Sequence, residues 1–591
     1  MKYLITFDTK IVRQEQSSEW RVEEVLVFGS NLSADLSNLP MDNQSVFFIP
    51  TVLDYNNSLS YGGAGLALRI LMKYIRSSIT SIDIVMMGNE SESNFLLHYD
   101  YPNILKIPGL HYIRFNKNTV ASYRIPQREL LQAKEYKPYL DNLGLKIPSS
   151  FKSTHSLTNE WCLYKWNSFM GYNENASSLF GHLYFEYLIT LEKLCSTRNK
   201  TVTDHLKGRI ANYPSSRILV IDDKAGWHSF FKDMFSNADK VDIHCIGEDF
   251  NKLEFEDIEK RIVDEVNDFR PHVIILDFRL MEDKDAEVKD NMQQISGYRI
   301  LAKALKGSFN KPLESFGRQV IIFTATSRIE NILLLKEGNA DGFILKEKPE
   351  NYQGKEITEK AISKMAFTLE TAADRAKFLI PLNEKLKELS KIIHTYYNSK
   401  NLLRTIENLS VKVNVVSQSL RQLTQKNELN EDILKLVYLN IFNIFEEIKR
   451  CPLFVEFPND YSMIIHANQE LKVCDHDKSY IYKKSPDDWN CVHKYSLSCM
   501  HHKYCKEKDL NFAICGLILF RLGFVQTDDS DWNTIRIIRN AIAHGNYNQL
   551  ENMNLNMSVS TLKDYSLKML DLLNDIINPS NLKDITLKEL N

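Results

Sequence analysis

Apolar runs of strand length alternate with helical periodicity at the start of the chain. The runs 25–28, 46–49 and 82–87 are largely apolar, and residues 65–75 have the three-and-four spacing of a buried helix face. Strands separated by helices predict a parallel sheet with helices packed on its faces. We therefore expect residues 1–125 to form an α/β domain.

The next segment, residues 126–212, has no such alternation. It contains Trp161, Trp166 and an apolar-periodic stretch from Leu179 to Leu194. Periodicity of this kind indicates helices rather than strands. We expect a helical connector here.

Four short apolar runs mark the segment 213–352. Each is followed by polar residues, and none alternates with polar positions, which is the pattern of strands buried on both faces. The segment predicts a doubly wound (βα)5 domain with a parallel sheet. The runs are 218–221, 273–276, 320–323 and 342–345.

The remainder of the chain has helical spacing. Apolar positions recur every three or four residues at 357–365 and 382–393, which predicts long linker helices over residues 353–427. Residues 408–424 continue this spacing and could form a dimerisation seam. We expect residues 428–591 to be an all-helical bundle, so the whole chain is predicted to combine α/β domains with an all-α domain.

Length and composition support several folded domains. The chain has 591 residues, of which 43% are hydrophobic and 25% charged, with a formal net charge of -3. These values are typical of globular proteins and exclude a uniformly basic nucleic-acid-binding chain. The N-terminus lacks a signal-peptide pattern, and no run of about 18 apolar residues is present. We expect a cytoplasmic protein without a membrane partner.

Carboxylates follow two of the four runs in residues 213–352. Asp222 and Asp223 follow the first run, and Asp277 follows the second. Thr324 and Lys346 follow the third and fourth. The carboxyl ends of parallel strands meet at one edge of the sheet, where ligands bind, and hard carboxylate oxygens suit Mg²⁺.

This order of an acidic pair, a single aspartate, a hydroxyl and a lysine resembles the receiver domains of two-component response regulators. The resemblance implies that Asp277 accepts a phosphoryl group from a histidine kinase or another phosphorelay donor. It also implies that Asp222 and Asp223 hold Mg²⁺ together with Asp277.

The same resemblance assigns a switch to three further residues. Thr324 would bind the acyl phosphate, Lys346 would offset its charge, and Phe343 would be the aromatic side chain that reports phosphorylation. The sequence departs from the family in its long charged loop at 279–296 and in the two residues between Lys346 and Pro349. The alternative is an inactive fold of receiver type.

The N-terminal α/β domain lacks the matching chemistry. Asp54 follows the apolar run 46–53, but no acidic pair precedes it, and the run 25–28 ends in Gly29-Ser30. The glycines at 62–65 do not have the spacing of a phosphate-binding loop. We interpret this domain as receiver-like or as another interaction domain.

Residues 532–545 predict a helix that ends at a glycine. At about 100° per residue, Ile535, Ile538 and Ile542 share an apolar face, whereas Asn540 and His544 lie on the far side. Gly545 follows as a helix stop.

The sequence Arg539-Asn540-Ala541-Ile542-Ala543-His544 resembles the Arg-Asn-x-x-x-His motif of the HEPN superfamily, which includes metal-independent ribonucleases of toxin and antiviral defence systems. The resemblance implies a homodimer in which Arg539 holds a phosphate of RNA, His544 acts on the 2′-hydroxyl and Asn540 orients the pair. The alternative is that Arg539 and His544 only stabilise the end of the helix.

A cysteine- and histidine-rich insert lies between the first and the motif-bearing helix of this region. Cys474, Cys491, Cys499 and Cys505 are interspersed with histidines. Such ligands suit a structural Zn²⁺ site. The missing Cys-x-x-Cys spacing leaves ordinary thiols as the alternative.

Together these patterns predict a response regulator whose phosphorylation at Asp277 controls an RNA-cleaving effector. The competing hypothesis is a non-catalytic two-component signalling scaffold, in which the helical domain only binds a partner.

Overall fold

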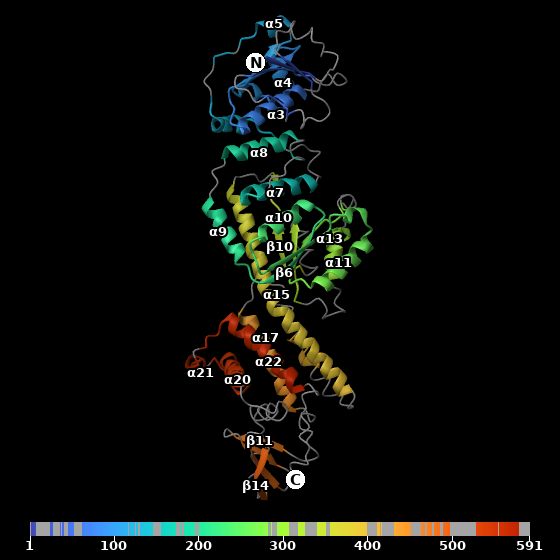
Figure 1. The fold of residues 1–591 in the computed structure, drawn as a ribbon, viewed down its shortest axis with the longest axis vertical. Coiled ribbons are helices and arrows are strands. Elements are labelled where there is room, and N and C mark those ends of the chain that lie inside the picture. The colour runs from blue at the N-terminus through green and yellow to red at the C-terminus, as the bar shows by residue number, and fades with distance from the viewer. Residues whose placement is uncertain are drawn as a thin grey trace.

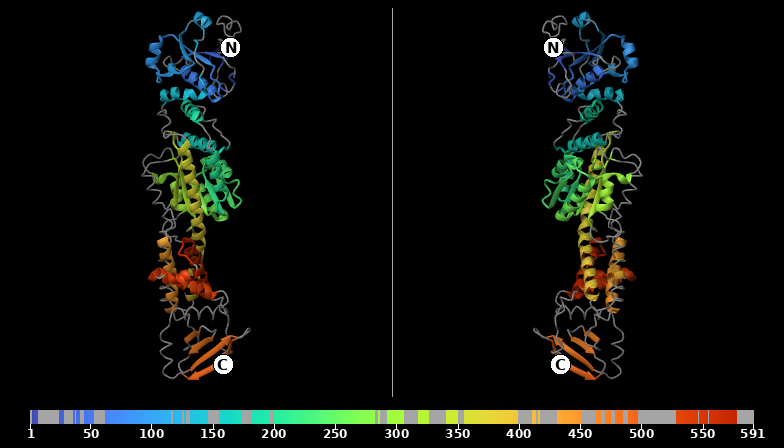
Figure 2. Two further views of the ribbon diagram at one scale, coloured as in Figure 1. Left: turned by 90° about the vertical axis from the view of Figure 1, so that its left-hand side faces the viewer. Right: turned by 90° about the vertical axis from the view of Figure 1, so that its right-hand side faces the viewer.

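The structure of this chain is a computed structural model that describes residues 2–6, 24–27, 36, 38–40, 45–52, 62–115, 117–124, 126–127, 131–145, 155–172, 179, 182–195, 200–281, 285, 292–305, 317–325, 340–349, 355–398, 410–413, 415–416, 431–450, 462–466, 470–474, 478–484, 489–496, 528–545, 547–553 and 555–577. Two parallel sheets, a helical bundle and a small antiparallel sheet follow one another along the long axis of the molecule (Figures 1 and 2).

The first sheet is parallel and has the order β2-β1-β3-β4-β5. Residues of β3 and β4 are almost completely buried, because helices pack against a sheet whose strands are apolar on both faces. The expected α/β architecture is therefore present, and β1 and β5 are strands that the sequence pattern did not single out. The strands are β1 (Lys2–Thr6), β2 (Glu24–Val27), β3 (Val46–Pro50), β4 (Asp83–Gly88) and β5 (Leu110–Arg114).

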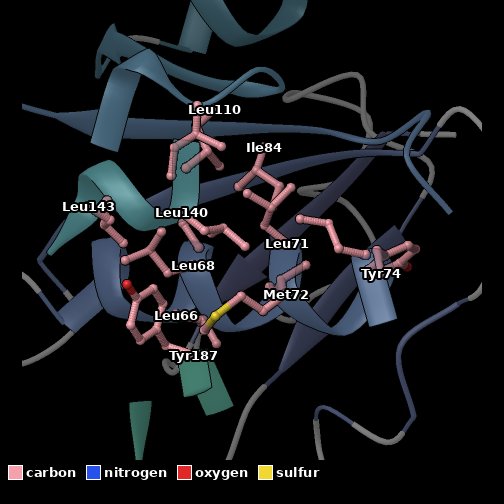
Figure 3. Close-up of a cluster of buried hydrophobic side chains, with 14 of the residues drawn as sticks. Leu66, Leu68, Leu71, Met72, Tyr74, Ile84, Leu110, Leu140, Leu143 and Tyr187 are labelled. Atoms are coloured by element: carbon pink, nitrogen blue, oxygen red, sulfur yellow. The ribbon is translucent and has the colours of Figure 1, made fainter. Parts of the chain in front are cut away.

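Helix α3 (Gly62–Arg76) provides much of the core of this domain. Leu68, Leu71 and Tyr74 on α3 are fully buried or nearly so, and they pack with side chains from the sheet and from two later helices (Figure 3). The other helical elements are α4 (Glu92–His98), η2 (Ile104–Lys106), α5 (Lys117–Ser122), η3 (Ala133–Tyr136) and α6 (Lys137–Leu143).

Three helices connect the first sheet to the second: α7 (His155–Met170), α8 (Leu183–Cys195) and α9 (Lys200–Ala211). The described part of the segment predicted as a connector is helical. Helices α8 and α7 lie between the two sheet domains (Figure 1).

The second sheet is also parallel, with the order β10-β9-β8-β6-β7. Counted along its own strands, this order is the same as in the first sheet. Helices pack on both faces, and each face has a separate apolar core. The strands are β6 (Ser216–Ile221), β7 (Val241–Ile246), β8 (Val273–Asp277), β9 (Gln319–Thr324) and β10 (Gly342–Leu345). The helices are α10 (Ala225–Phe235), η6 (Phe250–Lys252), α11 (Phe255–Phe269), η7 (Met292–Gln294), α13 (Ser296–Arg299) and the π-helix η8 (Ile300–Leu305).

Helix α15 (Lys355–Asn398) belongs to two cores. Its first half buries Ile362 and Leu369 against the second sheet. Its second half buries Leu382 and Leu389 in the helical bundle. The change from one core to the other falls between Ala373 and Phe378, and Pro381, which cannot donate a helix hydrogen bond, lies just beyond it in the bundle part of the helix. The segment predicted as a linker thus forms one long helix that contributes to the cores of both the second sheet and the helical bundle.

The C-terminal bundle combines α15 with α17 (Glu431–Arg450), α20 (Asp528–His544) and α22 (Val559–Ile577), and α21 (Asn548–Asn552) follows α20. Val413 and Val416 of the proposed dimerisation seam are buried in this bundle. The rest of that seam lies largely outside the described residues.

The prediction that residues 428–591 are wholly helical is wrong. Four strands form an antiparallel sheet in the order β11-β12-β13-β14. They are β11 (Ser462–His466), β12 (Glu470–Cys474), β13 (Lys478–Lys484) and β14 (Trp489–Ser496). The alternation of polar and apolar residues in 470–474 and the aromatic and β-branched run Tyr480-Ile481-Tyr482 are the strand signals that the search for helical spacing passed over.

None of the described helices combines the length and apolar character needed to cross a membrane.

Candidate functional site

The carboxyl edge of the second sheet gathers three carboxylates. Asp222 and Asp223 follow β6, and Asp277 ends β8, the strand paired beside it. Ligand oxygens of the three residues lie within 4.8 Å of one another, and all three residues are buried. The sheet order changes direction between these two strands, which is where open parallel sheets place their ligand sites.

Two glycines allow the chain to pack closely around these aspartates. Gly247, at φ 126°, lies so near Asp222 that an added Cβ would be 2.4 Å from the Asp222 carbonyl oxygen. A Cβ on Gly297 would likewise be 2.4 Å from the carbonyl oxygen of Asp277. Only glycine fits without moving the backbone. The loop after β7 and the start of α13 therefore pack closely against the two strand ends.

Lys346 brings a buried ammonium group to the carboxylates. Its Nζ lies 3.3 Å from Asp222 Oδ2 and 3.4 Å from Asp277 Oδ1. Burial lowers the pKa of Lys346, but Asp222 and Asp277 outweigh burial and raise that pKa overall. The lysine is therefore charged at neutral pH.

The two oxygens of Asp277 differ in their hydrogen bonds. Asp277 Oδ1 accepts a hydrogen bond from the backbone N–H of Phe278 at 2.8 Å. Asp277 Oδ2 is buried and accepts no hydrogen bond from the described residues. Burial raises the pKa of Asp277 well above its usual value, although Lys346 acts in the opposite direction. A cation at Oδ2 would favour the ionised form.

The pKa of Asp223 is raised by burial, as is that of Asp277. Burial and then the neighbouring Asp222 raise the pKa of Asp223 to about 6. Its Oδ2 accepts a hydrogen bond from Asn251 Nδ2 at 3.3 Å and lies 3.6 Å from Lys224 Nζ. Three carboxylates next to one buried ammonium leave excess negative charge, which a hard divalent cation such as Mg²⁺ would neutralise. The donor set fits such an ion.

Thr324 ends β9, and Lys346 directly follows β10, the strand paired beside it. Thr324 is fully buried, and its carbonyl oxygen accepts a hydrogen bond from the Lys346 backbone N–H at 2.8 Å. Phe343 on β10 is half-buried and packs on the core of the opposite face of the sheet. The structure therefore brings Asp222, Asp223, Asp277 and Lys346 together and places Thr324 at the end of the strand between them, whereas Phe343 packs on the other core.

Other residues of the site gave no recognisable sequence signal. His228 Nε2 lies 2.9 Å from the Asp222 carbonyl oxygen, and its Nδ1 lies 3.0 Å from Glu248 Oε1. Asp285, within the long charged loop, is buried and accepts hydrogen bonds from the backbone and hydroxyl of Ser296. Such contacts depend on tertiary packing and not on spacing along the chain.

The helix α20 places the second candidate site in the bundle. Arg539 Nη1 donates a hydrogen bond to Asn540 Oδ1 at 3.0 Å, and its guanidinium lies 5.2 Å from the centre of the Phe442 ring. Arg539 Nη2 also lies 4.0 Å from Glu446 Oε1. His544 is exposed at the last turn. The arrangement leaves His544 accessible, with Arg539 held one turn before it.

The predicted end and apolar face of this helix are confirmed. Gly545 has φ 67°, and its N–H donates to the Ala541 carbonyl oxygen at 2.9 Å. Ile535 and Ile538 are fully buried, and Ile542 is half-buried against the same core.

The cysteine-rich insert is only partly described. Cys474 and Cys491 lie in β12 and β14, where the structure describes the strands but not these side chains. Cys499 and Cys505 lie outside the described residues. The zinc hypothesis therefore stays a prediction.

Comparison with protein families and with curated proteins gave no match for this chain.

Proposed function

We propose that the second sheet is a phosphoacceptor receiver in which Asp277 is phosphorylated. The observation that carries the proposal is the buried cluster of Asp222, Asp223, Asp277 and Lys346. Buried acidic groups next to a fixed ammonium are costly to maintain, and perturbed groups of this kind gather at functional sites. A site of this composition suits transfer of a phosphoryl group onto a carboxylate.

The chemistry follows from the two oxygens of Asp277. Oδ2 attacks the phosphorus of the donor, a new O–P bond forms, and the bond between phosphorus and the donor's leaving group breaks. The leaving group is the histidine imidazole when the donor is a histidine kinase or phosphorelay protein, and it is acetate when the donor is acetyl phosphate. Lys346 offsets negative charge on the transferring oxygens, and Thr324 offers its hydroxyl to the product.

Mg²⁺ held by Asp222, Asp223 and Asp277 would supply further charge neutralisation. The buried Asp277 Oδ2 without a hydrogen bond among the described residues and the raised pKa of Asp223 support this assignment.

For the bundle we propose RNA cleavage without a metal, in a homodimer that brings two copies of α20 together. Arg539 would hold the scissile phosphate, and Asn540, hydrogen-bonded to Arg539, would orient the guanidinium. His544 would take a proton from the 2′-hydroxyl, whose oxygen bonds to phosphorus while the bond from phosphorus to the 5′-oxygen breaks, and the leaving 5′-oxygen takes a proton from water. A toxin-like or antiviral role in the cytoplasm fits such an activity. The second candidate function is a signalling scaffold, favoured by the contacts of Arg539 with Glu446 and Phe442, which also suit a structural arginine.

One experiment tests the first proposal directly. Purified protein is incubated with labelled acetyl phosphate and Mg²⁺, and label on Asp277 is identified by trapping the acyl phosphate. We expect label on the parent protein and none on Asp277→Asn. Equal labelling of both proteins would overturn the assignment.

A further inference from the structure

Helix α7, which precedes the second sheet in the chain, is buried on both sides. Trp161 and Tyr164 belong to the core of the first sheet. Cys162 and Trp166, on other sides of the same helix, belong to a core of the second sheet. Helix α7 therefore packs in the cores of both domains. It lies between α8 and α10 (Figure 1).

On one side α7 contacts the surroundings of Lys346. Cys162 Sγ accepts a hydrogen bond at 3.0 Å from the backbone N–H of Glu347, the residue that follows Lys346. Trp166 packs edge-on against Trp227, with ring centres 5.5 Å apart. The ring of Trp227 lies 5.1 Å from Lys346 Nζ. Helix α7 thus holds both the backbone beside the lysine and the aromatic wall behind its ammonium.

On the other side α7 is joined to α8 by a buried ion pair. Lys165 Nζ lies 2.9 Å from Glu192 Oε1, and both side chains are less than one tenth exposed. Breaking a buried pair by removing one partner is costly, because the remaining charge stays desolvated. The two helices should therefore move as a unit.

Helix α8 is in turn fixed to α3 of the first domain. Glu186 on α8 is almost fully buried and pairs with both Arg69 and Arg76 of α3. Arg76 Nη1 also donates a hydrogen bond to Thr190 Oγ1 at 2.9 Å. A continuous set of buried polar contacts therefore connects α3 to the loop that carries Lys346.

We infer that α7 positions Lys346, and that the first domain thereby controls phosphorylation of Asp277. The inference rests on the proposed function of the second sheet and adds its regulation. Lys346 would stabilise negative charge on the phosphoryl group only if its ammonium lies at the right distance from the transferring oxygens. A small displacement of the Lys346 backbone would therefore change the rate of phosphoryl transfer. A ligand or partner that shifts α3 against α8 would move α7 and change the rate at Asp277. By reciprocity, phosphorylation would change how tightly the first domain binds that ligand.

The first test changes the contact between α7 and Glu347 in the full-length protein. Cys162→Ala removes the acceptor of the Glu347 N–H, whereas Cys162→Ser keeps an acceptor at that place. Cys245→Ala on β7 is the matched control, because it removes a partly buried thiol of the same domain that is not the acceptor of the Glu347 N–H. The readout is the initial rate of labelling by acetyl phosphate, measured on samples that keep the parent's thermal unfolding midpoint within a few degrees.

We expect Cys162→Ala to slow labelling about fivefold, the size expected for one lost buried hydrogen bond, and Cys162→Ser to recover most of that loss. Cys245→Ala should stay within about twofold of the parent. Equal rates for the two alanine variants would overturn the positioning role of α7.

The second test needs no phosphoryl transfer, so it separates this inference from the proposed function. Hydrogen exchange of the Glu347 amide is followed in Glu186→Gln, which weakens the contact of α8 with α3. Arg76→Lys serves where Glu186→Gln does not fold. The control is Glu370→Gln, which breaks an exposed ion pair between Glu370 on α15 and Arg209 on α9.

We expect several-fold faster exchange at Glu347 in the Glu186 or Arg76 variant and no change in the control. Unchanged exchange in a folded variant would show that the first domain does not reach the site. If exchange responds but the parent takes no label at Asp277, the coupling stands and the phosphoacceptor proposal fails.

Discussion

The ammonium group of Lys346 lies 3.4 Å from Asp277 Oδ1, although the two residues belong to strands that are not neighbours in the sheet. Lys346 follows β10, Asp277 ends β8, and β9 lies between them. The lysine side chain reaches across the end of β9, where its ammonium lies 4.3 Å from the centre of the Phe323 ring. The ammonium group that pairs with Asp277 thus lies against the Phe323 ring. Because the ring excludes water, it strengthens the ion pair between Lys346 and Asp277.

Loss of Lys346 should separate metal binding from phosphoryl transfer. Lys346→Gln leaves three carboxylates without their ammonium, so Mg²⁺ should bind more tightly while labelling by acetyl phosphate slows by about 10- to 100-fold. Titration calorimetry and labelling measure the two effects. Lys232→Gln, on the exposed side of α10, is the control and should change neither. Weaker Mg²⁺ binding in Lys346→Gln would contradict this account of the charge balance.

Asp223 predicts how stability and metal affinity depend on pH. The pKa of Asp223 is about 6 in the fold, raised first by burial and then by Asp222. Between the ordinary pKa and 6 the folded state binds more protons than the unfolded state, so this group's contribution to stability falls as pH rises through that window. Without divalent metal, Asp223→Asn should therefore stabilise the fold at pH 7 by about 1–3 kcal/mol.

The same titration governs Mg²⁺. Protons compete with the cation for Asp223, so affinity should fall as pH is lowered through 6. Calorimetric titrations at pH 5.5 and 7.5 measure this dependence. Affinity that is independent of pH over this range would remove Asp223 from the ligand set.

Gly297 should be needed for the site to form. A Cβ at this position would lie 2.4 Å from the Asp277 carbonyl oxygen and 2.5 Å from that of Phe278, so Gly297→Ala must displace the backbone that carries the phosphoacceptor. We expect a fall in the unfolding midpoint and loss of labelling. Gly208→Ala on α9, where an added Cβ meets nothing within 4 Å, is the matched control and should be neutral or slightly stabilising.

RNA cleavage, if it occurs in the bundle, should persist in EDTA and require His544. Arg539 and His544 supply charge and proton transfer themselves, so a phosphorylated or phosphomimetic sample should cut RNA without free divalent metal. His544→Ala should lower the rate by at least about 100-fold. His394→Ala, at an exposed histidine of α15 in the same bundle, is the control. Cleavage that needs added Mg²⁺, or a His544→Ala protein that cuts at the parent rate, would favour the scaffold hypothesis.

The sequence alone determined the parts of this protein that depend on local pattern. Four apolar residues in succession, as in 273–276, predict a strand buried on both faces of a parallel sheet, and the aspartate that follows this run is then expected at the carboxyl edge of the sheet. The stop at Gly545 likewise follows from one residue's freedom to adopt positive φ, which the structure confirms at 67°. Such features need no knowledge of distant neighbours.

Tertiary structure decided everything that depends on residues far apart in the chain. The strand order brought Lys346 over β9 to Asp277. Packing placed α7 between two cores and set Cys162 against Glu347. The apolar residues of α7 do not gather on one face of the helix, so its sequence does not indicate which neighbour it packs against. The antiparallel sheet from β11 to β14 was missed for the opposite reason. Its signal is local, but helical spacing on both sides of it favoured a single helical domain, and pairing between strands is what settled the fold.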